Sequence, residues 1–509
     1  MNREGLIETI KNFHDEIYRE NYSHLIGLKE DLNETKIYSK YQYLFTKENI
    51  KFLKDLVAKS TALEKRKNNY LIGYVIGNFV GQKLSKISDE AAAFEAKAFV
   101  EFKGNKIPYR GLTKIMNNED NKENRDLLYE AQKPIKLKLL DYNIKYLKQE
   151  LKLLNDLGYK SYIELNSAIK EVDYFKLRDE LKAFLVETDE KFTVLIHEAM
   201  KSINVNTDDA RNYDWGYYAR HKEFDGAFPK ENVISTLKKT LLGIGFNLDI
   251  QKNIELDIEE REKKVPRAFM MPIKVPDEIK LVIKPNGGYE DYNAILHEAG
   301  HAEHYAHVNP DLDYEFKHFG DHSVTEIFSF LFDNLMQDPN WLKIHTRMNN
   351  QEIEKFVKEN YLQDLFMFRR YIAKLIYELK LFSDDLRKLD SNFNPAKGYY
   401  KNFGECYSDI LSKATKVKYP KSSYLIDLDG GFYVADYLRA WIGERQLRHK
   451  LKQDYGTEWF KNKKAGEFLK KLYSLGNSKH INELMQESGF KGLDTIYIFR
   501  DFKDFLDKA

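Results

Sequence analysis

Hydrophobic residues recur every three or four positions along most of the chain, as in Leu6, Ile10, Phe13 and Ile17. This spacing places them on one face of a helix, so it predicts helix through most of the sequence. The longest stretches of this kind lie near residues 62–100, 123–155, 173–202 and 350–390. Proline, which breaks helices, occurs only 11 times. We therefore expect a mainly α protein.

One region departs from this helical pattern. Short β-like segments separated by prolines occupy residues 254–256, 267–271 and 278–284, and Tyr289 then opens a helix. We expect a small sheet here, with residues 1–252 forming a mainly helical lobe. Residues 253–509 would form a second lobe with the sheet and a helical C-terminal part, the two lobes sharing one core. An edge strand of the sheet could pair with an extended peptide, and a hairpin that caps the core is the alternative.

Composition removes several classes of protein. The chain has 509 residues, 42% of them hydrophobic, which is enough for a large core. Its 81 basic and 80 acidic residues nearly cancel, so no global field favours nucleic acid. No run approaches the roughly 18 apolar residues that span a bilayer. The single cysteine, Cys406, cannot form an intramolecular disulfide and is best explained as an inert buried thiol. The residues after Met1 contain no apolar core of a signal peptide. We expect a cytoplasmic monomer without nucleic-acid or membrane partners.

The strongest chemical motif lies in the helix that Tyr289 opens. It reads His297-Glu298-Ala299-Gly300-His301. Histidines at i and i+4 lie on one face of a helix and can bind one metal ion, while Glu298 projects to the side and can act as a general base. The motif predicts a metallopeptidase site in which His297 and His301 are metal ligands and Glu298 is catalytic.

A second helix supplies a candidate third ligand. Glu326 lies in an otherwise largely apolar stretch, where a carboxylate is costly unless it meets a cation. Asp333, seven residues later, lies on the same helix face and could hold the free nitrogen of a ligand histidine. The alternative is a capping box, in which Glu326 folds back onto Ser323 at the start of the helix.

A rival third ligand is His307, ten residues after His297. Three-histidine zinc sites with this spacing need a glycine at the intervening turn, where this chain has His304. In a continuous helix His307 would lie about 15 Å along the axis from His297, too far to share a metal. We expect His304 and His307 on the helix surface or beside the ligands.

These residues resemble the thimet oligopeptidase and oligoendopeptidase family of zinc peptidases. The resemblance rests on residues 296–302, on Glu326 at the family's spacing, and on the segments 213–218 and 430–441. It implies a two-lobed helical ellipsoid with a small sheet beside a deep central channel that admits short unfolded peptides. The strand at 278–284 stands where the family has its substrate-pairing edge strand.

The chain also departs from the family. Asp427-Leu428-Asp429 stands where a histidine is usual, a few residues before the paired glycines. Arg439 takes the place of a transition-state tyrosine, and Tyr433 and Tyr437 lie one position away from the family's tyrosines. The alternative for Tyr433, Tyr437 and Trp441 is an aromatic stripe that packs in the core.

The sequence thus predicts a zinc oligopeptidase with one Zn2+ per chain and short peptides as substrates. Glu298 would take a proton from the attacking water and deliver it to the departing amine. Tyr437, Tyr433 or Arg439 would stabilise the oxyanion. Two alternatives remain. One is a zinc carboxypeptidase of similar fold, in which Arg439 binds the substrate's terminal carboxylate. The other is a peptide-binding protein without activity, which would have no need of Glu298.

Overall fold

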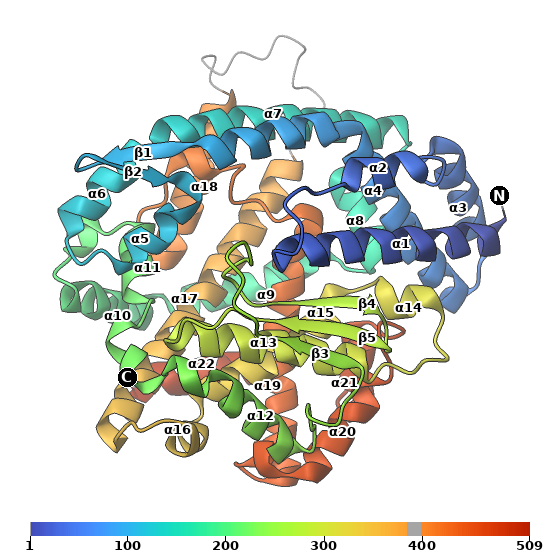
Figure 1. Cartoon of the computed structure of the whole chain (residues 1–509). Helices are drawn as coiled ribbons and strands as arrows, with labels where there is room; N and C mark the ends of the chain where they lie inside the picture. The colour runs from blue at the N-terminus through green and yellow to red at the C-terminus, as the bar shows by residue number, and fades with distance from the viewer. Residues whose placement is uncertain (1, 384–398, 509) are drawn as a thin grey trace. The chain divides into compact units, whose positions relative to one another are not determined.

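The structure, a computed structural model, describes residues 2–383 and 399–508, and it confirms a mainly α fold with small sheets (Figure 1). The predicted long helices are α4 (Ala62–Lys97), α6 with α7 (Lys122–Ala131 and Lys133–Asp156), α9 with α10 (Tyr174–Glu187 and Asp189–Ser202), and α17 (Asn350–Ser383). The last part of the stretch predicted at 350–390 lies outside the described residues.

The chain divides into two compact units, each built from three segments. The first unit contains Met1–Ile76, Lys222–Lys358 and Asp436–Asp501, and the second contains Gly77–His221, Glu359–Ala435 and Phe502–Ala509. The lobe boundary expected at residue 253 falls inside the middle segment of the first unit. Helices α4, α17, α19 (Tyr433–Tyr455) and α22 (Ile496–Lys508) each run from one unit into the other.

The first unit holds the small sheet, and its strands lie where the proline-separated segments predicted them. They are β3 (Ile254–Asp257), β4 (Phe269–Lys274) and β5 (Glu278–Val282), in the order β3-β5-β4. β3 is parallel to β5, and β4 is antiparallel to it. The expectation that 278–284 forms the edge strand is therefore wrong. β5 is the central strand, and its almost continuous burial fits a strand with neighbours on both sides.

Two helices of the first unit, α13 (Tyr289–Ala306) and α15 (His322–Asp333), pack closely together, and β4 and β5 contact α13 (Figure 1). Gly300 makes the close helix packing possible. A Cβ added there would come within 2.4 Å of Phe328 O and 2.5 Å of Ser329 Cα on α15. The glycine inside the histidine motif thus lets the backbones of α13 and α15 approach each other.

Eight further α-helices lie entirely within the described part of the first unit. They are α1 (Arg3–Leu25), α2 (Glu34–Lys40), α3 (Lys47–Lys59), α12 (Val233–Ile244), α14 (Tyr314–His318), α16 (Pro339–His345), α20 (Lys463–Tyr473) and α21 (Ile481–Glu487).

Within its described residues the second unit is helical apart from one hairpin, β1 (Phe99–Phe102) with β2 (Asn105–Pro108), and an isolated bridge between Arg211 and Lys418. Its other helices are α5 (Leu112–Asn118), α8 (Tyr162–Lys170), α11 (Asn212–Tyr218) and α18 (Tyr399–Thr415). Trp215 on α11 stacks on Phe366 of α17, with the ring centroids 3.9 Å apart. Among the helices that the structure describes, none is both long and apolar enough to cross a membrane.

Candidate metal centre

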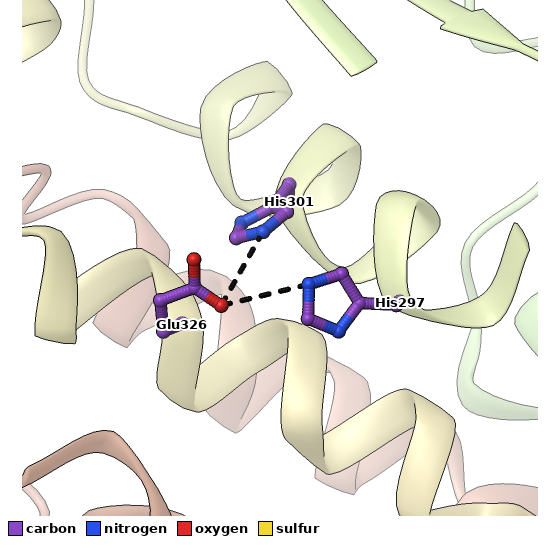
Figure 2. Close-up of side chains that lie close together, drawn as sticks. All are labelled: His297, His301 and Glu326. Carbon is purple, nitrogen blue, oxygen red and sulfur yellow. Dashed lines mark ion pairs between the residues drawn. The ribbon is translucent and has the colours of Figure 1, made fainter. Parts of the chain in front are cut away.

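Side chains from two helices converge at one point of the first unit. His297 and His301 lie one turn apart on α13, and Glu326 reaches toward both from α15 (Figure 2). Glu326 Oε2 lies 3.5 Å from His297 Nε2 and 3.7 Å from His301 Nε2. All three ligand atoms lie within 4.8 Å of one another. Donor atoms that share a tetrahedral zinc ion are roughly 3.4 Å apart, so the group fits a zinc ion after a small adjustment.

The other nitrogen of each histidine is also engaged. His297 Nδ1 donates to Asp333 Oδ2 at 2.8 Å, and His301 Nδ1 lies 2.7 Å from Thr325 Oγ1. These contacts hold both rings with Nε2 directed toward Glu326. Such outer partners normally fix the tautomer and orientation of metal-binding histidines. Asp333 has the partner that the sequence suggested for it, whereas Thr325 was not predicted, although it directly precedes Glu326.

The two histidines differ in their electrostatic environment. Burial lowers the pKa of His297, but the hydrogen bond and charge of Asp333, with the charge of Glu326, raise it to about 9. Burial and the neighbouring charges of His297 and His322 hold the pKa of His301 well below its usual value. The carboxylates of Asp333 and Glu326 thus favour positive charge at this point. A divalent cation bound by the two histidines and Glu326 would supply such a charge.

Glu298 lies beside the histidines and is tied to the sheet. Its Oε2 accepts a hydrogen bond of 2.9 Å from Met270 N on the edge strand β4. Burial raises the pKa of Glu298, while the charge of His297 and the Met270 amide act in the opposite direction. A carboxyl group with a raised pKa can exchange a proton nearer neutral pH, as a general base and acid must.

Aromatic side chains form one wall of the site. The Phe330 ring on α15 lies 5.6 Å from the His297 ring, and it stacks on Trp441 at 5.0 Å. Tyr437 on α19 lies 5.8 Å from Phe330 and 6.2 Å from Trp441, measured between ring centroids. Phe330 thus contacts both Tyr437 and the predicted metal ligand His297.

The start of α15 argues against a capping box at Glu326. The N-cap residue is Asp321, whose carboxylate accepts from Ser323 N at 3.0 Å. Glu326 instead lies in the body of the helix, where its Oε2 accepts from Ser329 Oγ at 3.1 Å and faces the histidines. The glutamate is therefore available at the metal centre.

The neighbouring histidines have other surroundings. His307 caps the C-terminus of α13, with Nδ1 2.9 Å from Glu303 O. His304 is fully buried against Phe328 and Tyr473, so of its two expected places the helix surface is wrong, while the place beside the ligands stays a prediction. Neither joins the group of potential ligands found among the described residues.

Two further predicted site residues are placed differently. Tyr433 belongs to the second unit, where Lys170 Nζ lies 5.9 Å from the centre of its ring. Arg439 belongs to the first unit, and its guanidinium is held by Asp321 and Asp436. The side chain of Arg439 is 6% exposed. A guanidinium held by two buried carboxylates is poorly placed to bind a third carboxylate from a substrate.

Comparison with known proteins establishes the fold. No family model and no curated protein sequence matches the chain. A crystal structure of a "putative oligoendopeptidase F" from Bacillus anthracis str. Ames has the same fold, with a TM-score of 0.70. It is 16% identical in sequence, and the match covers 99% of this chain and 90% of that chain. The chain therefore has an oligopeptidase fold over essentially its whole length.

Proposed function

We propose that this protein is a zinc-dependent oligopeptidase. The observation that carries the proposal is the convergence of His297 Nε2, His301 Nε2 and Glu326 Oε2 within 4.8 Å of one another, with Glu298 beside them. Two histidines and a carboxylate are a usual ligand set for catalytic zinc, which keeps one position open. The oligopeptidase fold of the chain supports the same assignment.

A zinc ion bound here would polarise the scissile carbonyl and lower the pKa of water to roughly 7. Glu298 accepts the proton of the attacking water and then delivers it to the departing amine. The Met270 amide keeps the Glu298 carboxylate in place during both transfers. Tyr437, beside Phe330, donates a hydrogen bond to the carbonyl oxygen as negative charge develops there.

The substrates proposed are short unfolded peptides, cut at internal bonds. Glu298 is hydrogen-bonded to the edge strand of the sheet, so an extended peptide that follows β4 would pass the catalytic carboxylate. The motif at 296–302 and the later Glu326 extend the proposal to membership of the thimet oligopeptidase and oligoendopeptidase family. The ion pairs of Arg439 speak against the carboxypeptidase alternative, which needs this guanidinium for the substrate.

Digestion of a mixed peptide library, read by mass spectrometry, tests this function. Wild-type protein loaded with zinc should cut short peptides internally, lose the activity with a chelator, and regain it when zinc is added back. Amidation of the peptides' C-termini should leave cleavage intact, whereas a carboxypeptidase would lose it. A Glu298→Gln variant purified in parallel is the control for contaminating peptidases. Absence of cleavage by zinc-loaded wild type would refute the proposal.

A further inference from the structure

A buried charge cluster links the two helices that border the metal centre. Arg439 on α19 makes a bidentate ion pair with Asp321, at 2.7 and 2.8 Å, and a third bond of 2.6 Å to Asp436. The side chains of Asp321 and Asp436 are completely buried. A planar guanidinium matches this arrangement because it donates in several directions within one plane.

Asp321 also caps the N-terminus of α15. Its Oδ1 accepts from the backbone N–H of Ser323 at 3.0 Å and from the Ser323 hydroxyl at 2.6 Å. The same carboxylate therefore caps the N-terminus of α15 and binds Arg439. The position of the α15 N-terminus is in this way tied directly to α19.

The first turns of α15 carry the two side chains that contact the histidines of the proposed metal centre. Thr325, which contacts His301 Nδ1, and Glu326 follow Asp321 by four and five residues. Tyr437 follows Asp436 directly and precedes Arg439 by two residues on α19. A shift of α15 relative to α19 would change the positions of Glu326 and Tyr437 relative to each other and alter the contact at His301.

We propose that Arg439 is a positioning residue. Through its ion pair with Asp321 it fixes the start of α15 against α19, and Asp436 of α19 holds the guanidinium in place. Glu326 and Thr325 then meet the histidines while Tyr437 stays against Phe330. This inference rests on the proposed zinc peptidase function. In this proposal Arg439 holds the helices that carry the site residues and does not bind the substrate.

The geometry of the cluster favours an arginine at position 439. Burial alone would raise the pKa of Asp321, but the charges and hydrogen bonds of Arg439 and His480 hold it well below its usual value. His480 Nδ1 lies 3.8 Å from Asp321 Oδ2. A lysine at position 439 would keep the charge but would not span both oxygens of Asp321 together with Asp436.

Two variants test the proposal by different routes. Arg439→Lys keeps the charge and loses the planar fork. Asp321→Asn keeps a good helix cap and loses the ion pair. In both we expect zinc to dissociate faster, because loss of groups that hold metal ligands in place typically weakens metal affinity by roughly tenfold or more. The visible absorption of the cobalt-substituted protein should change, and kcat should fall while KM stays within about twofold.

Arg445→Lys is the matched control. Arg445 lies on the same helix, its side chain is 2% exposed, and it pairs with Glu444 and Asp501 instead of a residue of α15. We expect this variant to lose thermal stability without any change in zinc dissociation or the cobalt spectrum.

The outcomes separate this proposal from the function it rests on. Normal zinc dissociation and a normal cobalt spectrum in both Arg439→Lys and Asp321→Asn would overturn the positioning role. A rise in KM confined to substrates with a free C-terminal carboxylate would also overturn it, in favour of substrate binding. Failure of the proposed function would show in the wild type, as absence of zinc binding and of peptide cleavage.

Discussion

The backbone N–H of Met270 donates a hydrogen bond of 2.9 Å to Glu298 Oε2 and thereby joins the edge strand of the sheet to the motif helix. Pro272, two residues further along β4, pairs with Ile279 of β5 and has no N–H, so its nitrogen must lie on the side of β4 that faces away from β5. Residues two apart on an antiparallel strand direct their N–H groups to the same side, so the Met270 N–H also points away from β5. Glu298, the proposed base, is thus held by the side of β4 that faces away from β5.

Glu298→Gln should abolish turnover and leave zinc and peptide binding intact. The glutamine carbonyl can still accept the Met270 N–H, so the side chain keeps its place but cannot accept a proton. Calorimetric titration with a peptide, beside a cleavage assay, measures both properties. Activity above a few per cent of wild type would remove Glu298 from the role of base.

Gly300→Ala should lower both stability and zinc binding. The new Cβ would meet the α15 backbone at 2.4 to 2.5 Å, so the two helices that carry the proposed ligands must separate. Overpacking of this kind costs about 1–3 kcal/mol or more. Thermal denaturation and zinc analysis measure the two effects, and Gly77→Ala, where a Cβ meets no atom within 4 Å, is the control. Unchanged zinc content and stability in Gly300→Ala would show that this helix contact is not needed.

Tyr437→Phe should lower turnover roughly a hundredfold, because it removes the hydroxyl proposed as an oxyanion donor. The ring and its contacts with Phe330 and Trp441 remain, so zinc content and thermal stability should not change. Tyr433→Phe in the second unit is the comparison. Near-normal rates in both variants would assign Tyr437 to packing of the aromatic wall.

Glu378 of the second unit should make stability fall as the pH rises. Burial raises its pKa from 4.5 to about 8, against the opposing charge of Lys374 and the Asp429 amide. The folded protein therefore binds this proton more tightly than the unfolded chain. The stabilisation is complete below about pH 4.5 and is lost progressively up to about pH 8, at about 1.4 kcal/mol for each pKa unit.

Glu378→Gln tests this pH dependence, since the amide does not titrate. Its melting temperature should decline less than that of wild type between pH 5 and pH 9. Glu378 Oε2 has no hydrogen-bond partner within residues 2–383 and 399–508, so the substitution breaks no bond at that atom. Equal declines in the two proteins would show that Glu378 is ionised in the folded state throughout this range.

Local sequence patterns predicted many of the secondary-structure elements. Periodicity predicted the long helices, and alternation between prolines predicted three strands within a few residues of their ends. The β1–β2 hairpin was not predicted, although Lys103-Gly104 with positive φ at both residues is a typical hairpin turn. Strand order could not be predicted, because it depends on pairings such as Ile254 with Ile279 that local pattern does not specify.

In the candidate site, too, only the features that depend on local spacing were predictable from the sequence. The i, i+4 spacing of His297 and His301 follows from helix geometry, so their proximity was predictable. The ion pair between Asp321 and Arg439 joins residues 118 positions apart, and the Met270 amide is a backbone group that any residue provides. Sequence identifies reactive side chains, whereas the contacts that hold them depend on how distant segments pack.

The most direct test of the metal centre is elemental analysis of the purified protein and its variants. Wild type should carry close to one zinc per chain, and His297→Ala and Glu326→Ala should lose most of it. His307→Ala, which removes a histidine outside the ligand group, should keep the zinc. Full zinc content in Glu326→Ala together with loss of zinc in His307→Ala would contradict the assignment of the three ligands.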